Sequence, residues 1–334
     1  MSPTPAPLPS ASDALSPALI ARFRRDLSAL FDIERGRLLV AVSGGGDSLA
    51  LMLLARAALG DRCLAATVDH GLRAASASEA AFVAGLAAAR GIAHRALRGE
   101  LPARAGRTAN LSARARALRY VLLEAERVRV GADAIATAHH ADDQLETMVM
   151  RLNRGAGVAG LAGVRAKGGR IVRPLLGWRR AELAAIVADA GIVPVEDPTN
   201  VDERYDRARL RKVLSSMDAF DTGHWAASAR ALGDAEDAIG WSVERLAGER
   251  IAAVEGRIEL VADDLPFELQ RRLVERCLRA VEPSINPRGE ALALLAALLR
   301  CGRSGMLGNV RAAVARRGGR TLWTFVQAPA RRSH

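Results

Sequence analysis

The sequence is short of the residues that mark extracellular, metal-binding and membrane proteins. Its three cysteines, Cys63, Cys277 and Cys301, stand alone, with no Cys-x-x-Cys pair and no Cys/His cluster at metal-ligand spacing. This spacing argues against a disulfide framework and against zinc or iron–sulfur ligation. No apolar run reaches the length of a membrane span, and the N-terminus lacks the basic and apolar regions of a signal peptide. We therefore expect a cytoplasmic protein with no membrane partner and a disordered leader over residues 1–17.

Lysine is nearly absent, because the chain has only Lys167 and Lys212 although its net charge is +11. An arginine excess of this size predicts a polyanionic partner such as a nucleic acid. A GC-rich genome would also enrich arginine and alanine, so the net charge alone leaves both explanations open. The distribution favours a polyanionic partner, since no acidic residue follows position 302 while seven arginines do: Arg303, Arg311, Arg316, Arg317, Arg320, Arg331 and Arg332.

The chain is long enough for two domains, because 334 residues exceed the usual size of a single core. In its first two thirds, short β-branched apolar runs alternate with stretches of helical period, which predicts a parallel sheet with crossover helices. The expected strands are 38–42, 64–68, 92–97, 134–138 and 171–172, and the expected helices are 49–58, 78–90, 112–129, 142–152 and 180–190. We predict an α/β domain over 18–215.

The remainder of the chain, residues 216–334, is predicted to form a smaller, mainly α-helical domain. Amphipathic stretches cover 225–248, 266–280 and 288–301, and short strand-like pieces stand at 257–261 and 321–327. Four glycines near the C-terminus make the last thirty residues ambiguous between strand, turn and loop.

The most informative motif is a glycine-rich turn between a buried strand and an apolar helix, Ser43-Gly44-Gly45-Gly46-Asp47-Ser48. Small residues let the backbone wrap a phosphate, and the N-terminus of the following helix offers N–H groups to it. The turn is not a Walker A loop, because no Lys-Ser or Lys-Thr pair follows. A glycine-rich turn can also be a plain tight connection. The carboxylate of Asp47 would be costly in an anion-binding turn without a cation, so we expect Mg²⁺ between it and the phosphates.

A second carboxylate-rich segment follows a strand end and runs into a helix. It begins with two consecutive histidines, which point apart and therefore make a poor metal site. Asp143 and Glu146 are three residues apart and fall on one helical face, where they can accept an ammonium group. Asp69-His70, at the end of the second strand, is either part of a ligand site or a structural turn.

These segments resemble the signature motifs of the PP-loop superfamily and, within it, of the lysidine synthases. The turn at residue 43 matches SGGxDS, residues 69–73 match DHGLR letter for letter, and residues 139–147 match HHxDDQxET. Six ordered segments between residues 37 and 214 carry the resemblance, and Thr199 stands where the family more often has serine. From its length we expect the chain to lack the extra terminal domain of longer members.

The resemblance implies an α/β PP-loop fold and a ligase that uses ATP to adenylate the wobble cytidine, position 34, of the CAU-anticodon tRNA(Ile). Free L-lysine then displaces AMP to give lysidine, with pyrophosphate as the other product, so that the tRNA reads AUA as isoleucine. A tRNA 2-thiolase and a non-catalytic RNA-binding module are the rival functions. The absence of paired cysteines opposes the first, and the intact carboxylates oppose the second. A homodimer is one option for the assembly.

The resemblance also implies roles for individual residues. Those implied to be catalytic are Asp47, Arg119, Asp143 and Glu146, with Asp47 as the magnesium contact. The ATP site is expected at Ser43, Gly44, Gly45, Gly46, Asp47, Ser48, Asp69 and His70. Lysine is expected at Asp143, Glu146 and Asp197, and tRNA at Arg151, Arg154, Arg207 and Arg211.

Overall fold

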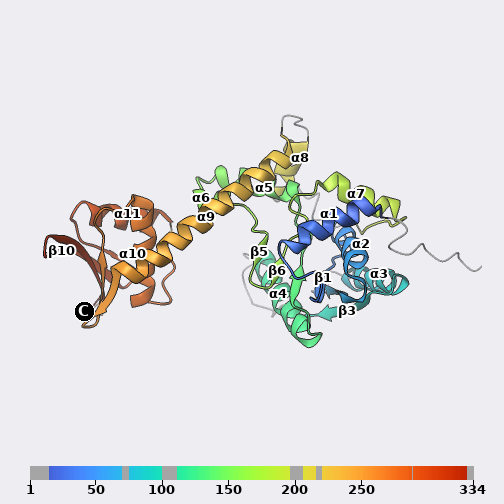
Figure 1. Cartoon of the computed structure of the whole chain (residues 1–334), viewed down its shortest axis with the longest axis horizontal. Coiled ribbons are helices and arrows are strands. Elements are labelled where there is room, and N and C mark those ends of the chain that lie inside the picture. Colours follow the sequence, from blue (N-terminus) through green and yellow to red (C-terminus); the bar gives the residue numbers. More distant parts are fainter. Residues whose placement is uncertain are drawn as a thin grey trace, which may run out of the picture. The chain divides into compact units, whose positions relative to one another are not determined.

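The computed structural model describes residues 15–69, 75–99, 111–195, 206–215, 220–287 and 289–328. The chain divides into two compact units, Met1–Gly233 and Asp234–His334, and each has its own sheet and its own core (Figure 1). Most of the predicted disordered leader lies outside the described residues, and the predicted domain limits stay predictions. No helix in the described ranges is both long and apolar enough to cross a membrane.

The first unit is built on a six-stranded sheet of order β3-β2-β1-β4-β6-β5. All neighbouring pairs are parallel except β5 and β6, which form an antiparallel hairpin. The α/β fold predicted from the alternation of strands and helices is confirmed. The strands are β1 Leu38–Ala41, β2 Cys63–Asp69, β3 Ala93–Arg98, β4 Ala134–Ala136, β5 Lys167–Gly168 and β6 Ile171–Val172.

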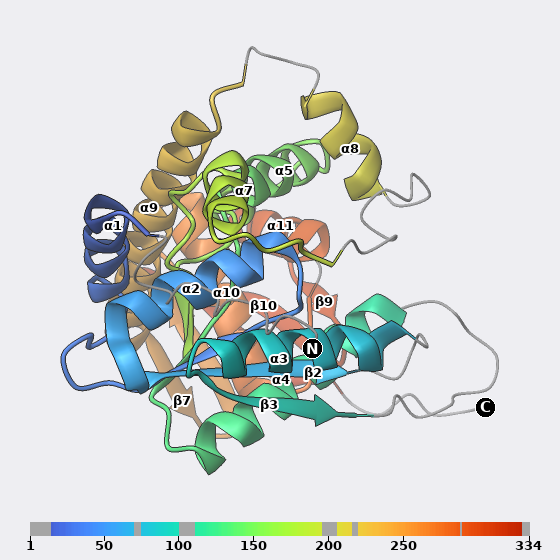
Figure 2. The same ribbon diagram turned by 90° about the vertical axis from the view of Figure 1, so that its right-hand side faces the viewer.

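Helices cover both faces of this sheet, which explains why its central strand is apolar at successive positions. Leu38 and Val40 of β1 point into the larger core with α1, α2, α3 and α7, whereas Leu39 packs against Leu123 of α4 on the opposite face. Helices α2 and α7 lie side by side in both views (Figures 1 and 2). The helices are α1 Pro17–Ser28, α2 Gly46–Leu59, η1 Gly60–Arg62, α3 Ala75–Ala89, α4 Leu111–Arg129, α5 Ala141–Leu152, α6 Val158–Leu161, α7 Arg180–Asp189 and α8 Asp206–Ser215.

The second unit combines helices with an antiparallel sheet of order β7-β8-β11-β10-β9. The two strand-like pieces predicted at 257–261 and 321–327 are confirmed, and they pair with each other. Strands β7, β9 and β10 were not expected, so the sheet is larger than the prediction of a mainly helical domain implied. The elements are α9 Thr222–Arg250, which begins in the first unit, β7 Ile251–Val254, β8 Arg257–Val261, α10 Phe267–Val281, α11 Gly289–Arg300, β9 Gly305–Leu307, β10 Val310–Arg317 and β11 Arg320–Gln327.

Four of the arginines that follow position 302 belong to strands of this sheet: Arg311, Arg316, Arg317 and Arg320. Trp323 and Phe325 of β11 are fully buried in the core of the second unit, together with Ala312 of β10. Arg311 lies between the buried Val310 and Ala312 on β10, and both Arg311 and Arg317 are exposed. Deleting residues from 303 onward would remove three strands, so this truncation cannot separate RNA binding from folding.

Candidate active site

One pocket of about 480 Å³ gathers side chains from several of the predicted motifs. It lies at the carboxyl ends of β1, β2 and β4, because neighbouring parallel strands end at the same edge of the sheet. Its polar and charged lining consists of Ser43, Asp47, Ser48, Thr67, Glu79, Arg116, Arg119, Tyr120, Thr137, His139, His140, Asp143, Arg180 and Arg211.

The loop after β1 is held in shape by its own second serine. The Ser48 hydroxyl accepts a hydrogen bond from the backbone N–H of Ser43 at 3.1 Å and donates one to the Gly45 carbonyl at 2.8 Å. Gly44 has φ +87°, a conformation that side chains rarely adopt, and its carbonyl accepts the N–H of Val195 at 3.0 Å. Helix α2 then begins at Gly46, so its first N–H groups have no partner within the helix. This arrangement suits a phosphate.

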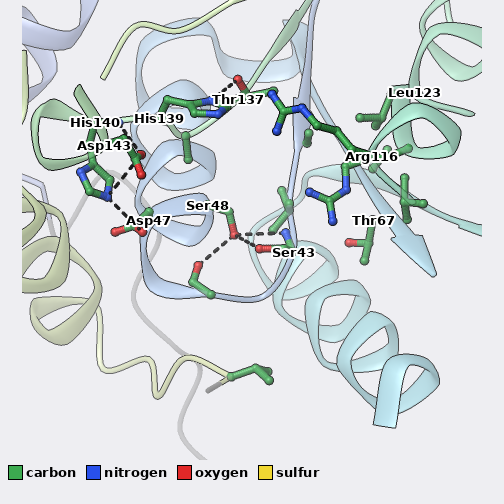
Figure 3. Close-up of a pocket in the computed structure, with 18 of the residues that line it drawn as sticks. Ser43, Asp47, Ser48, Thr67, Arg116, Leu123, Thr137, His139, His140 and Asp143 are labelled. Atoms are coloured by element: carbon green, nitrogen blue, oxygen red, sulfur yellow. Dashed lines mark hydrogen bonds and ion pairs between the residues drawn. The ribbon is translucent and has the colours of Figure 1, made fainter. Parts of the chain in front are cut away.

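His140 forms the centre of the acidic end of the pocket (Figure 3). Its Nε2 atom lies 3.4 Å from a carboxylate oxygen of Asp47 and 3.6 Å from one of Asp143, and its Nδ1 atom lies 3.4 Å from Asp142. Burial alone would lower the pKa of His140, but the hydrogen bonds to Asp142 and Asp47 and the charges of Asp143 and Asp47 raise it to about 10. The imidazole is therefore cationic at neutral pH and draws the carboxylates from α2 and α5 together.

The two consecutive histidines have separate surroundings, as expected from the sequence. The Nδ1 atom of His139 lies 3.0 Å from the Thr137 hydroxyl, whereas His140 faces the carboxylates (Figure 3). Asp142 is fixed by the backbone N–H of Arg180, which lies 2.8 Å from it. Within the described ranges, no three His, Cys, Asp or Glu side chains gather closely enough to hold a metal ion on their own.

Arginines from α4 line the other end of the pocket. Arg116 lies across the loop from the Asp47–His140–Asp143 group, beside Thr67 and Leu123 (Figure 3). Arg119, one turn later, also lines the pocket; the family resemblance implies a catalytic role for it. The pocket thus has carboxylates near the start of α5, with Arg180 and Arg211 beside them, and two further guanidinium groups on α4.

Glu146 does not line this pocket, although the sequence predicted it beside Asp143 in the lysine site. It is buried, with 3% of its surface exposed, and Arg211 of α8 binds both of its carboxylate oxygens, at 2.7 and 3.2 Å. Arg211 itself lines the pocket. Sequence reasoning assigned Arg211 to tRNA and missed this pair, because the two residues are 65 positions apart.

Several other predicted site residues do not line the pocket. Asp69 is the last residue of β2 and does not line the cavity. The guanidinium of Arg151 donates hydrogen bonds to the carbonyls of Gly160 and Gly163 and so stabilises the glycine-rich loop after α5. Arg154 lies exposed in that loop. The residues or side chains outside the described part of the chain are His70, Asp197 and Arg207. The pocket also includes residues that no motif had singled out: Thr67, Glu79, Arg180 and Val195.

Comparison with known proteins agrees with this geometry. A PP-loop domain family model matches residues 19–217. The tRNA(Ile)-lysidine synthase of Novosphingobium aromaticivorans is 49% identical over 94% of this chain and 95% of its own length, and that of Zymomonas mobilis is 39% identical over 89% and 90%. Among solved structures, the U34-tRNA thiolase NcsA of Methanococcus maripaludis superposes with a TM-score of 0.52 at 15% identity, over 64% of this chain and 78% of that chain, and so shares the fold.

Both the extent and the level of these matches are sufficient to assign the family. The family model spans more than half of the chain, and two enzymes of one activity match almost its whole length. The chain belongs to the tRNA(Ile)-lysidine synthases, a family of the PP-loop ATP-using enzymes.

Proposed function

We propose that this enzyme uses ATP to activate the wobble cytidine of the CAU-anticodon tRNA(Ile) and then joins lysine to it. The observation that carries the proposal is a pocket that brings the glycine-rich loop after β1 together with the carboxylates of Asp47 and Asp143 and the guanidinium groups of Arg116 and Arg119. In the first step the cytidine O2 attacks the α-phosphorus of ATP, and pyrophosphate leaves. In the second step the lysine side-chain amine attacks C2, and the C2–O bond breaks as AMP leaves. A poor electrophile thus becomes a good one before the amine arrives.

The loop after β1 is suited to hold the pyrophosphate portion of ATP. Ser43, Gly45, Asp47 and Ser48 line the pocket at the start of α2, and the helix dipole favours negative charge there. Arg116 and Arg119 supply positive charge at the opposite end, where they can stabilise the charge that develops on the transferred phosphoryl group. Asp69 and His70 remain proposed parts of the nucleotide site.

Magnesium fits the carboxylates at the start of α2 and α5. Asp47 and Asp143 lie 3.4 and 3.6 Å from the same nitrogen of His140, so two hard oxygen ligands are close to each other at the wall of the pocket. Mg²⁺ commonly binds one or two carboxylates and completes its shell with phosphates and water. We assign Asp47 as the magnesium contact, because it lies on the phosphate loop itself; a bound ion would supply positive charge next to the leaving pyrophosphate.

The cysteines support lysidine formation over thiolation. Cys63 and Cys277 are buried, and burial raises the pKa of each thiol to about 12, which keeps both protonated and unreactive. None of the three cysteines lines the pocket. A thiolase would need a sulfur carrier or cluster ligands near the activated base, and the described pocket has none.

The products of turnover test the proposed function. With α-labelled ATP, lysine and tRNA, we expect the label in AMP and an equal amount of pyrophosphate, and labelled lysine should enter the RNA. Omitting tRNA should suppress product formation, because the base is the nucleophile of the first step. Labelled ADP with free phosphate would contradict the proposed chemistry.

Exposed arginines of the second unit are proposed to contact tRNA phosphates. Arg311 and Arg317 lie on one face of β10, opposite the buried side chains of that strand. The proposal places the reaction in the cytoplasm, because the substrate is a tRNA, and it does not require a homodimer, because one chain lines the described pocket.

Neutralising these arginines should weaken tRNA binding and its dependence on salt. For Arg311→Gln/Arg317→Gln, the slope of log affinity against log salt should fall by about 2 if each side chain contacts one phosphate. The matched control is Arg276→Gln/Arg279→Gln on α10, where each guanidinium already pairs with a glutamate, Glu244 or Glu275. Filter binding at several salt concentrations measures both slopes. Equal slopes in wild type and Arg311→Gln/Arg317→Gln would leave the arginine excess as a compositional bias.

A further inference from the structure

A second pocket of the first unit lies where β1, β4 and β6 begin, at the sheet edge opposite the candidate active site. This amino-edge pocket has a volume of about 350 Å³, and Gly36, Ala134 and Arg170 line it at or just before the starts of these strands. The active-site pocket is lined instead by Ala41 and Thr137, at or just beyond the carboxyl ends of β1 and β4. Because a strand rises about 3.3 Å per residue, the four residues of β1 keep the two pockets roughly 10 Å apart. The amino-edge pocket is therefore separate from the site of the reaction.

Three exposed cations line the amino-edge pocket: Arg35 from the loop after α1, and Lys167 and Arg170 from the β5–β6 hairpin. Among the described residues, none of their charged groups has a hydrogen-bond or ion-pair partner. The acid that the charge of Arg170 affects is Glu124, whose pKa is lowered chiefly by the hydrogen bond from Arg127 and less by Arg170. Both oxygens of Glu124 already accept from Arg127, at 2.7 and 2.8 Å. The three cations are therefore available to a ligand.

Other arginines at this edge of the sheet differ from these three because they have partners within the protein. Arg37 directly precedes β1, and its guanidinium donates to the carbonyl of Val130 at 2.8 Å. Arg62 directly precedes β2, and its guanidinium donates to the carbonyl of Ile33 at 2.5 Å. Hydrogen bonds to backbone carbonyls give Arg37 and Arg62 a structural role, which the cations of the amino-edge pocket do not share.

The amino-edge pocket also contains two carboxylates, and both accept hydrogen bonds from the backbone. Asp32 Oδ1 accepts the N–H groups of Glu34 and Arg35 at 3.0 and 3.1 Å, and Asp133 Oδ2 accepts the N–H of Arg37 at 2.9 Å. Neither carboxylate forms an ion pair with a cation of the pocket in the part of the chain that the structure describes. Three cations against two carboxylates leave an excess of positive charge, which favours an anionic ligand.

The chemistry of the lining fits a phosphate ester better than a bare inorganic anion. A guanidinium can donate to two phosphate oxygens at once, and a lysine ammonium adds a compact positive charge. The remainder of the lining is partly apolar, with the side chains of Leu30, Phe31 and Val172. A volume of about 350 Å³ is typical of a small-molecule site and exceeds what one phosphate group fills. The space therefore suits a phosphate that carries a sugar and a base.

We propose that the amino-edge pocket is a second nucleotide site, in which Arg35, Lys167 and Arg170 bind the phosphate. The nucleotide is either free in solution or part of an RNA strand, since both present the same phosphate, sugar and base. A ligand held by all three cations joins the loop after α1 to the β5–β6 hairpin, whose strands have only two residues each. The inference does not depend on the proposed function, because binding at this site requires no turnover.

Binding of labelled AMP, measured by equilibrium dialysis, tests for the free nucleotide. The wild-type enzyme should bind AMP in the active-site pocket and again in the amino-edge pocket, whereas Lys167→Gln/Arg170→Gln should retain only the active-site binding. Each charged hydrogen bond to phosphate is expected to contribute about 10-fold in affinity, so the double substitution should weaken the second site about 100-fold. The converse variant, Arg116→Gln/Arg119→Gln, should weaken the active-site binding and leave the second site intact.

Filter binding of tRNA at several salt concentrations tests for a nucleotide within RNA. If RNA occupies the pocket, the slope of log affinity against log salt should fall by about 2 in Lys167→Gln/Arg170→Gln. The matched control is Arg25→Gln/Arg95→Gln, which removes two exposed arginines that already pair with carboxylates and should change neither measurement. Thermal unfolding establishes that each variant is folded. A wild-type enzyme with no second AMP site, together with an unchanged salt slope in Lys167→Gln/Arg170→Gln, would overturn the inference.

Discussion

Replacing Asp47 by asparagine is expected to abolish both chemical steps. Asp47 carries the carboxylate of the phosphate loop and lies 3.4 Å from the cationic His140, at the position assigned to magnesium. Asparagine keeps the shape and the start of α2 but removes the charge, so the leaving pyrophosphate loses its counterion. We expect tRNA-dependent pyrophosphate release to fall about 10²- to 10³-fold, the effect of removing one preorganised electrostatic contact.

The control for this substitution is Asp61→Asn. Asp61 is a 95% exposed carboxylate just beyond α2, it pairs with Arg56, and it lies outside the pocket. Its replacement should leave pyrophosphate release and lysine incorporation unchanged. Circular dichroism and thermal unfolding establish that both variants are folded. If folded Asp47→Asn releases pyrophosphate at more than about a tenth of the wild-type rate, less than the smallest loss expected of a catalytic contact, Asp47 is not the magnesium contact.

Replacing Asp143 by asparagine should separate the two steps instead of stopping both. The Asp143 carboxylate accepts the backbone N–H of His140 at 3.1 Å, and the asparagine carbonyl can retain that bond. The adenylated tRNA should therefore form, whereas its capture by lysine should slow, with a loss of roughly 2 to 4 kcal/mol in transition-state stabilisation. Pyrophosphate release and lysine incorporation, followed separately in one reaction, measure the two steps.

A rival role for Asp143 gives a different result in the same experiment. If Asp143 binds magnesium together with Asp47, adenylation fails as well, and both signals disappear. The two carboxylates lie close to the same His140 nitrogen, so the static geometry is compatible with either role. Loss of both steps would refute the assignment of Asp143 to lysine.

The first unit was predictable because local sequence and tertiary structure agree there. The run that contains Leu38, Leu39 and Val40 is buried on both faces, and a strand with helices on both sides requires that pattern. The loop motifs could be placed on the correct sheet edge because parallel strands leave no other place for them. The fold and the central part of the pocket were therefore accessible from the sequence.

The pairing of Glu146 with Arg211 was not predictable from the sequence. Helical spacing placed Glu146 on the same face as Asp143, but spacing along a helix says nothing about what packs against that face. Helix α8 supplies the partner from 65 residues away, and its arginine-rich sequence resembles a solvated or RNA-binding surface. Only the tertiary structure distinguishes these environments.

The sheet of the second unit was underestimated for a different reason. Strand β10 has the sequence VRAAVARR, in which alanine occupies several of the positions between the arginines. Alanine favours helices and gives little alternation of hydrophobicity, so the local signal for a strand is weak. The strand is stabilised instead by its pairing with β11, which contributes Trp323 and Phe325 to the core.

The hydrogen bonds of Ser48 reduce the conformational entropy that the phosphate loop loses when it binds a ligand. Ordering one flexible residue costs about 1–2 kcal/mol of conformational entropy, so a mobile phosphate loop would bind nucleotide weakly. Here Ser48 joins Ser43 to Gly45 within the protein itself, and the main part of that entropy is lost during folding and not on binding. A loop arranged in advance receives the pyrophosphate group equally well in ATP and as the released product. Release of pyrophosphate can therefore limit the rate of the whole catalytic cycle.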